Sequence, residues 1–223
     1  IAFGNNNTTD GLEANAVGFG NQSLGSSSHT FGSANNVTGN SSMGVGILNE
    51  VSGNNSYTFG RDNMVSEDGS IAVGFQNTVS SEDAVAFGSD NVVDGNFSVG
   101  MGLQNQATGS SSTAIGIQNE ASGDGSISMG EDNIASGASA SAIGFNNGAI
   151  GSESSSLGSD NYAVGSQSSS FGRSNDANGN RSNAFGYSNT VDGDDSTAVG
   201  RSNTATGNRS FAAGIESQAN GDR

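Results

Sequence analysis

The chain has 223 residues, of which 36 are Gly and 31% are hydrophobic, and it contains no Pro, Cys or Trp. With so few large apolar side chains, a conventional globular core is not expected. All six basic residues are Arg, against 22 Asp plus Glu, and the formal net charge is -16. This charge argues against binding to nucleic acid or to an anionic membrane, since both are themselves negative. No apolar run approaches the roughly 18 residues that span a bilayer, so we expect no direct membrane insertion by this segment.

Glycine recurs every 14 residues from Gly4 to Gly214, without insertion or deletion. We number each repeat so that this Gly is at position 4. A second Gly occupies position 11 in all repeats except two, where Glu67 and Ser81 replace it. Such a fixed period indicates a repeat architecture in which each repeat forms one structural unit.

Within each repeat the predicted elements are a strand at positions 14 to 4, a tight turn, a second strand at positions 7 to 11 and a second turn. Each half alternates small and variable residues and then closes on Gly and two polar residues, a pattern typical of strands and turns. A helix is excluded because two Gly per repeat would cost about 2 kcal/mol relative to Ala. The sequence therefore predicts an all-β fold, a parallel β-solenoid of about sixteen 14-residue coils forming one domain over residues 1–223. At about 4.8 Å a coil, the expected rod is roughly 75 Å long.

Strand alternation predicts which side chains face inward. Positions 14, 2 and 4 on one strand and positions 7, 9 and 11 on the other are small residues or Asn, which suit the interior of a narrow coil. Position 3 then points outward, and it is apolar in every repeat. We call these residues the apolar row and expect them to form a homotrimer interface, because so long an apolar stripe exceeds what a soluble monomer leaves exposed. The apolar row consists of Phe3, Val17, Phe31, Val45, Phe59, Val73, Phe87, Met101, Ile115, Met129, Ile143, Leu157, Phe171, Phe185 and Val199, with Ala213 in the last repeat.

An alternative interpretation places the apolar row inside the coil, opposite position 9, and leaves a self-sufficient monomer. Position 5 favours the interface. In the first eight repeats, a Phe at position 3 is followed two residues later by a small or polar residue. Smaller apolar residues at position 3 are followed by a large one, as in Val17 and Phe19. Compensation of this kind is expected from shape-matched packing between surfaces, although duplication of a two-coil unit would produce it too.

Position 7 predicts a second stacked series. Identical amides in successive coils can hydrogen-bond along a solenoid, so we interpret this series as a structural Asn ladder rather than a ligand site. The Asn ladder consists of Asn7, Asn21, Asn35, Asn49, Asn63, Asn77, Asn91, Asn105, Asn119, Asn133, Asn147, Asn161, Asn175, Asn189 and Asn203, and Ser217 ends it.

The repeat S-x-A-x-G-x-x-(S/N)-x-A-x-G resembles the head repeat of trimeric autotransporter adhesins, the YadA-like head of Gram-negative bacterial surface proteins. Clear instances are Ser112 to Gly116 followed by Asn119 to Gly123, and Ser196 to Gly200 followed by Asn203 to Gly207. The resemblance covers the chain in sixteen copies and departs from the usual repeat by favouring Asn at position 7. It implies a left-handed parallel β-roll, three copies of which associate with one sheet facing the threefold axis. A stalk and a membrane anchor are expected outside this chain.

The resemblance implies a cell-surface adhesin head, outside the cell on the outer membrane. Its expected partners are two further copies of the chain and an extracellular protein, glycan or solid surface. Two alternatives stay open: a self-assembling extracellular filament or phage or appendage fibre subunit with the same repeat, and an ice- or mineral-binding β-solenoid. An ice- or mineral-binding β-solenoid presents regular rows of Thr at one outward position, whereas Thr in this chain is scattered over positions 2, 8 and 10.

Nothing in the sequence predicts catalysis, a cofactor or an obligatory metal. The only His is His29, and no nucleophile and carboxylate are spaced to act with it. The turn carboxylates of Asp192, Asp194 and Asp195, and the pairs Glu67-Asp68 and Glu82-Asp83, could supply oxygen ligands to Ca²⁺, but they recur in too few repeats, so we interpret them as solvated. Ligand contact is expected from positions 8, 10, 12 and 13, distributed along the coils, because a β-roll has no deep cavity.

Overall fold

A computed structural model describes residues 1–222 and contains parallel β-strands but no helix in that range. A membrane-spanning helix is accordingly not found among these residues. The chain divides into two compact units, Ile1–Ser111 and Ser112–Arg223, with Arg223 outside the described residues. Each unit is a stack of 14-residue coils, so the predicted fold class, an all-β parallel solenoid, is confirmed.

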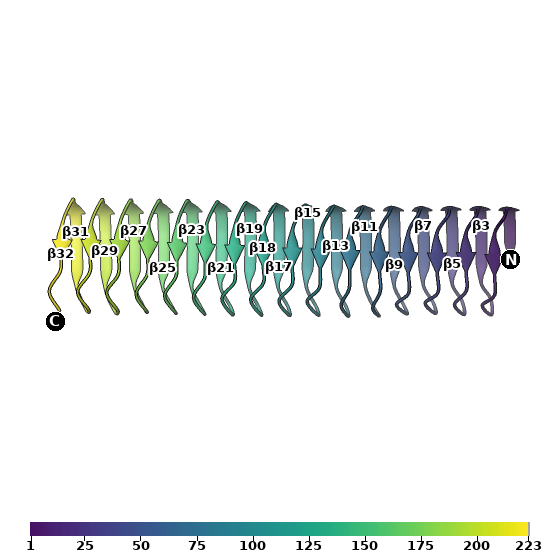
Figure 1. Ribbon diagram of the computed structural model, residues 1–223, viewed down its shortest axis with the longest axis horizontal. Helices are drawn as coiled ribbons and strands as arrows, with labels where there is room; N and C mark the ends of the chain where they lie inside the picture. The colour runs from purple at the N-terminus through teal and green to yellow at the C-terminus, as the bar shows by residue number, and fades with distance from the viewer. Residues whose placement is uncertain (223) are drawn as a thin grey trace. The chain divides into compact units, whose positions relative to one another are not determined.

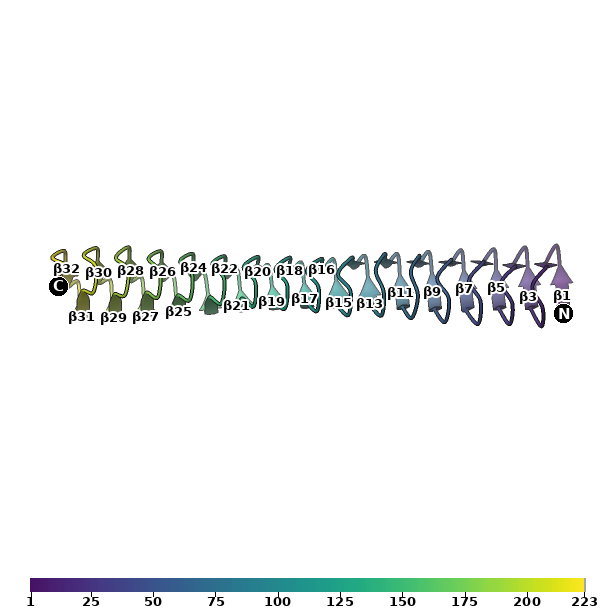
Figure 2. The ribbon, with the colours of Figure 1, turned by 90° about the horizontal axis from the view of Figure 1, so that it is seen from below.

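In unit 1 each coil contributes one long and one short strand, and the two kinds form separate sheets (Figures 1 and 2). The long strands are β1 (Ala2–Asn5), β3 (Asn15–Phe19), β5 (His29–Ser33), β7 (Met43–Ile47), β9 (Tyr57–Arg61), β11 (Ile71–Phe75), β13 (Val85–Ser89) and β15 (Val99–Leu103). The short strands are β2 (Thr8–Thr9), β4 (Gln22–Ser23), β6 (Asn36–Val37), β8 (Glu50–Val51), β10 (Met64–Val65), β12 (Thr78–Val79), β14 (Val92–Val93) and β16 (Gln106–Ala107).

Unit 2 repeats the same arrangement. Its long strands are β17 (Thr113–Ile117), β19 (Ile127–Glu131), β21 (Ser141–Phe145), β23 (Ser155–Ser159), β25 (Ser169–Arg173), β27 (Asn183–Tyr187), β29 (Thr197–Arg201) and β31 (Phe211–Ile215). Its short strands are β18 (Glu120–Ala121), β20 (Ile134–Ala135), β22 (Gly148–Ala149), β24 (Tyr162–Ala163), β26 (Asp176–Ala177), β28 (Thr190–Val191), β30 (Thr204–Ala205) and β32 (Gln218–Ala219).

Neighbouring strands within each unit pair in parallel with a register of 14 residues. Val73 on β11 pairs with Phe87 on β13, for example, and Phe171 on β25 pairs with Phe185 on β27. Because the register equals the repeat length, residues at one position stack directly on each other from coil to coil. A property shared by one position therefore becomes a continuous line on the surface or in the interior of each unit.

The two strands of a coil differ in length, which the sequence did not predict. The first runs over positions 1 to 5, but the second covers only positions 8 and 9. The chain already turns from position 10, and position 13 adopts a left-handed backbone conformation, with φ of 56° at Ser41 and 59° at Phe97. Position 6 does the same at the first turn, as in Leu48 with φ of 57°. Residues other than Gly, Asn and Asp rarely adopt this conformation, so residues such as Leu48 and Phe97 did not predict it, although the polar pattern predicted the turns themselves.

The interior of each coil is narrow and filled from positions 2, 7, 9 and 14. In unit 1 the largest apolar side chains there are at position 9, and they are Val37, Val51, Val65, Val79 and Val93, all fully buried. The Ser at position 14 is buried beside them, as at Ser56 and Ser70. The predicted inward direction of positions 2, 7, 9 and 14 is confirmed.

The alternation of side chains along a strand predicted that position 4 also faces the interior, and this prediction is wrong. The Gly residues at position 4 are not buried, and they have a positive φ, for example 127° at Gly74. A Cβ on Gly74 would overlap the carbonyl oxygen of Gly88 in the next coil. Gly is therefore required at position 4 for its backbone conformation and for the close approach of successive coils, and not for lack of space in the interior.

Candidate functional site

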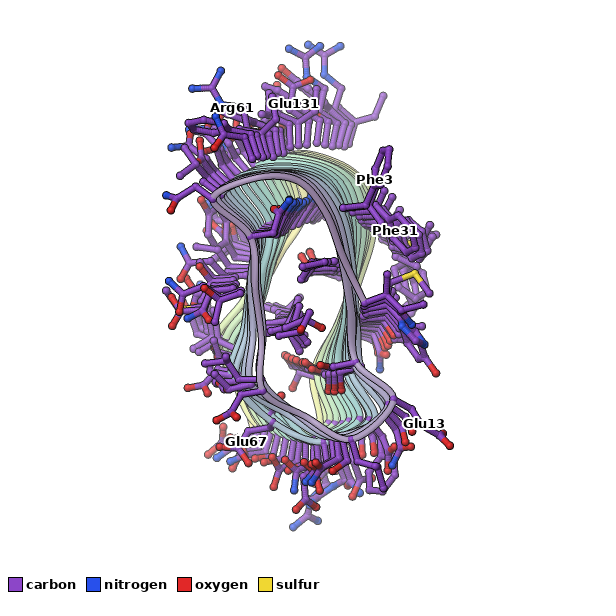
Figure 3. The ribbon with its side chains drawn as sticks, turned by 90° about the vertical axis from the view of Figure 1, so that its right-hand side faces the viewer. Phe3, Glu13, Phe31, Arg61, Glu67 and Glu131 are labelled. Atoms are coloured by element: carbon purple, nitrogen blue, oxygen red, sulfur yellow. The ribbon has the colours of Figure 1, made fainter. Side chains whose placement is uncertain are left out.

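The apolar row lies on the outer surface of the long strands. None of its residues is buried: Phe59 is 40% exposed and Leu157 44%. Figure 3 shows Phe3 and Phe31 of unit 1 pointing away from the coil. Because positions 2, 7, 9 and 14 already fill the interior, the alternative interpretation, with position 3 inside the coil, is wrong.

In unit 1 the apolar surface is wider than the apolar row alone. Position 1 on the same face is half-buried and apolar in five consecutive coils, at Met43, Tyr57, Ile71, Val85 and Val99. These side chains lie beside the apolar row because they are two residues away on the same strands. The long-strand face of unit 1 therefore presents two adjacent apolar columns over these coils.

In unit 2 the same face is narrower. Position 1 is mostly polar there, as at Ser141, Ser155 and Ser169, so no continuous apolar column lies beside the apolar row at that position. Its side chains nevertheless stack closely: the ring centroids of Phe171 and Phe185 are 5.3 Å apart. This tilted arrangement is a favourable geometry for an aromatic pair.

The Asn ladder lies inside the coil, next to the first turn. The side-chain nitrogen of Asn63 donates to Oδ1 of Asn49 at 3.0 Å, and it is within hydrogen-bonding distance of the carbonyl oxygens of Phe59 and Gly74. Its own Oδ1 accepts from the backbone nitrogen of Asn77 at 3.2 Å and from the side-chain nitrogen at 2.9 Å. The same pattern recurs in unit 2, for example between Asn161 and Asn147.

These amides are fully engaged. From Asn21 to Asn203 each ladder residue is at most 2% exposed, and in both units ladder residues bond to backbone groups of their own coil and of the next, as Asn21, Asn119 and Asn203 do. A buried amide whose donors and acceptor are already paired cannot bind an external ligand without breaking those bonds. The geometry supports the interpretation of position 7 as a structural series.

A second polar series, at position 12, was not predicted from the sequence. At the second turn, an Asn or Asp at position 12 accepts a hydrogen bond from the backbone nitrogen of position 12 in the preceding coil. Asp68 Oδ1 accepts from Asn54 at 2.7 Å, and Asp194 Oδ1 accepts from Asn180 at 2.8 Å. The frequency of Asn and Asp at position 12 was the available signal, since both residues commonly satisfy backbone groups in turns.

The turn carboxylates form exposed contacts rather than a cluster. Arg181 donates to Asp195 in the next coil, with Nη2 2.8 Å from Oδ2, and this guanidinium lowers the pKa of the Asp195 carboxyl. Glu67 points outward from the second turn of unit 1 (Figure 3). Over residues 1–222 no three metal-ligating side chains come together as a cation site would need. His29 contacts Asn15, with Nδ1 3.1 Å from the side-chain nitrogen.

The outer surface of the short strands is mainly polar, with one exception in unit 2. Ile134, Ile150, Tyr162 and Val164 are each about 40% exposed there and lie in neighbouring coils. The ring of Tyr162 covers Gly148 of the adjacent coil, where a Cβ would overlap it. The sequence pattern indicated that positions 8 and 10 are mostly polar, and it did not predict this apolar patch.

The described residues thus form a parallel β-solenoid with a buried Asn ladder and an exposed apolar row. Comparison with protein families then identifies the group: the chain matches the YadA head domain repeat over residues 66–91, 94–119, 121–147, 177–203 and 205–223. It belongs to this family of surface adhesin heads. No curated protein matches the chain.

Proposed function

We propose that this chain is the head of a homotrimeric adhesin at the cell surface and that it attaches the cell to a host, to another cell or to a solid surface. The observation that supports the trimer is the exposed apolar row together with its neighbours at position 1. Burying such side chains stabilises an assembly by about 1.5 kcal/mol or more for each one. Membership of the YadA head family supports the same arrangement.

The surface that contacts the target is, on this proposal, the polar outer face and its turns. Each coil offers a similar but unequal set of polar side chains, such as Glu120 and Ser122 in one coil and Thr204 and Thr206 in another. Many weak contacts add through multivalency, and three copies multiply them. Neither a cofactor nor a resident metal ion has a part in this function, and we propose no enzymatic activity.

The trimer is tested by the double variant Phe59→Asp and Phe87→Asp, with mass photometry at micromolar concentration. We expect a trimer for the original chain and monomers for the variant, because two charges in each copy would be buried without partners. The matched control is Met64→Asp with Val92→Asp, which alters exposed apolar residues on the short-strand face of the same unit. This control should remain trimeric.

A stable monomer of the original chain would contradict the proposal. A mass that grows without limit as concentration rises would instead support the alternative of a self-assembling filament. Attachment is tested separately by deleting two adjacent coils in register. We expect adhesion to weaken gradually as coils are removed, because the contacts are distributed over many of them.

A further inference from the structure

Three consecutive first turns of unit 2 share a sequence found nowhere else in the chain. They read Gly-Arg-Ser-Asn at Gly172 to Asn175, Gly-Tyr-Ser-Asn at Gly186 to Asn189 and Gly-Arg-Ser-Asn at Gly200 to Asn203. Because coils stack in register, Arg173 pairs with Tyr187 and Tyr187 pairs with Arg201 along the sheet. The three side chains therefore form one row at position 5.

The two guanidinium groups lie on either side of the tyrosine ring. The guanidinium carbon of Arg173 is 6.0 Å from the ring centroid of Tyr187, and that of Arg201 is 5.9 Å away. Both distances lie at the outer limit of a cation–π interaction, which at an exposed site favours this orientation of the Arg side chain only weakly. All three side chains are exposed, so the row presents two guanidinium groups to solvent.

Neither guanidinium has an ion pair or a hydrogen bond with any residue from 1 to 222. The contrast with unit 1 is direct. Arg61 is also at position 5 and contacts the ring of Phe75, but its Nε donates to the neighbouring Asp62 at 3.1 Å. In unit 2 the residue after each Arg is Ser174 or Ser202, so neither guanidinium has an adjacent carboxylate in the chain that pairs with it as Asp62 pairs with Arg61.

Hydroxyl groups lie alongside the row. Ser174, Ser188 and Ser202 occupy position 6 in the three successive turns, are partly exposed, and make no side-chain hydrogen bond among the described residues. Carboxylates limit the row at both ends: Asp160 is at position 6 of the preceding coil and Glu216 at position 6 of the following one. Asp160 accepts hydrogen bonds from Asn146 and Ser159, which lower the pKa of its carboxyl, and the charge of Arg173 lowers it further, although the two side chains form no ion pair.

We propose that Arg173, Tyr187 and Arg201, with the three adjacent serines, form a binding site for a carboxylated or sulfated polysaccharide. Two guanidinium groups two coils apart are separated by about 9.6 Å, comparable to the length of two linked sugar rings. Each can bind a carboxylate or sulfate through paired N–H groups, and the serine hydroxyls can bond to sugar hydroxyls between them.

Other anionic ligands fit this surface less well. A nucleic acid presents a charge at every nucleotide and favours an extended basic surface, whereas this row ends in Asp160 and Glu216 on a chain of net charge -16. An anionic lipid would need an apolar place for its acyl chains, and the nearest apolar side chains, Phe171, Phe185 and Val199 of the apolar row, are buried in the proposed trimer. The site lies at positions 5 and 6, away from positions 8, 10, 12 and 13, where the sequence alone suggested ligand contact.

The site is compatible with the proposed trimer. In unit 1 the equivalent side chain, Arg61, points from the turn at the end of the coil, and Phe31 of the apolar row points sideways (Figure 3). Burial of the apolar row therefore leaves position 5 of a repeat at the edge of the interface. The site itself lies within one copy of the chain, but its use in attachment depends on the proposed function.

The experiment uses the full chain in its native assembly state. The probe is a tetrasaccharide of alternating uronate and sulfated hexosamine, and its binding is measured by calorimetry. We expect Arg173→Gln with Arg201→Gln to weaken binding at least tenfold and Tyr187→Ala to weaken it several-fold. Arg61→Gln is the matched control, because this arginine already has a carboxylate partner, and it should bind as the original chain does. Retained binding by the Arg173→Gln and Arg201→Gln variant would overturn the proposal.

A second variant tests the site without removing either guanidinium. Ser174→Asp with Ser202→Asp gives each Arg the neighbour that Asp62 provides for Arg61. Asp62 shows that Asp is accommodated at position 6, where its φ is 54°, close to the 55° of Ser174 and the 54° of Ser202. We expect the same loss of binding with an unchanged melting temperature, and undiminished binding would overturn the proposal.

Further binding measurements distinguish an anionic polysaccharide from other negatively charged ligands. The carboxyl-reduced and desulfated tetrasaccharide should not bind, and neither an eight-nucleotide single strand nor a vesicle with anionic lipid should compete. Equal binding of the oligonucleotide or the vesicle would overturn the assignment to a polysaccharide. Mass photometry of the same samples reports the trimer independently, so failure of the trimer and failure of this site give different results.

Discussion

The two units have the same backbone but fill it differently. In unit 1 the widest interior residues are Val, at position 9 of five consecutive coils, whereas unit 2 has Ala at that position in every coil except the one with Val191. Unit 2 compensates with polar interior contacts: Ser128, Ser156 and Ser170 at position 2 each donate to the carbonyl of the Asn five residues later, at 2.7 to 2.8 Å. The backbone thus depends on what the units share, namely Gly at position 4 and Asn at position 7.

The outer surfaces differ in a related way. Unit 1 has two apolar columns on its long-strand face and a single Arg, which is paired. Unit 2 has one apolar column and the unpaired guanidinium groups of Arg173 and Arg201. We infer that unit 1 supplies more of the proposed trimer contact and that unit 2 supplies the more specific ligand contact. A repeat protein can divide its functions in this way because each coil contacts only its neighbours.

The largest expected effect tests the shared element. Asn63→Ala in unit 1 and Asn161→Ala in unit 2 should each lower the free energy of unfolding by about 3 kcal/mol, because each leaves several buried partners unpaired. Urea denaturation at one fixed protein concentration measures both. If the two losses differ by more than about 1.4 kcal/mol, which is tenfold in the folding equilibrium, the ladder does not contribute equally to the units. Asn40→Ala, at an exposed turn, should cost much less.

A smaller effect tests the two interiors. Val65→Ala should destabilise unit 1 by about 2 kcal/mol because it leaves a cavity, and the reverse change Ala163→Val should destabilise unit 2 by about 1 to 3 kcal/mol because it overfills a narrow coil. The change in the free energy of unfolding of each variant is obtained from its urea denaturation midpoint. Stabilisation by Ala163→Val would show that unit 2 has unused internal space, and the distinction between the interiors would then fail.

The smallest effect concerns the buried serines at position 14. In unit 1 the Ser56 hydroxyl donates to the carbonyl of Glu67 at 2.9 Å, whereas the Ser154 hydroxyl of unit 2 has no hydrogen-bond partner in the structure. Ser56→Ala should therefore cost about 1 kcal/mol, and Ser154→Ala should be close to neutral. Thermal unfolding of the two variants under the same conditions measures the difference between their losses of stability. An equal loss in both would indicate that the Ser154 hydroxyl is also bonded in solution.

Much of the candidate surface could be predicted from the sequence. The apolar row lies on the outer surface of the coil, as the alternation of side chains along the strand predicted. The Asn ladder is stacked inside the coil. Positions 6 and 13 could not be predicted as left-handed, because residues such as Leu48 and Phe97 do not favour that conformation by themselves. Their backbone is fixed by hydrogen bonds to the neighbouring coils, as in the bond from the Leu48 nitrogen to the Ser33 carbonyl at 3.0 Å.

The sequence by itself determined the 14-residue coil, the parallel stacking and the separation of an apolar outer series from a small-residue interior. It could do so because each property recurs at a fixed position and needs no knowledge of distant contacts. Only the tertiary structure decided that the second strand has two residues, that position 4 needs Gly for its positive φ, and that the guanidinium carbons of Arg173 and Arg201 lie 6.0 Å and 5.9 Å from the ring centroid of Tyr187. These features depend on distances between adjacent coils and on side-chain direction after a turn, which residue order alone does not specify.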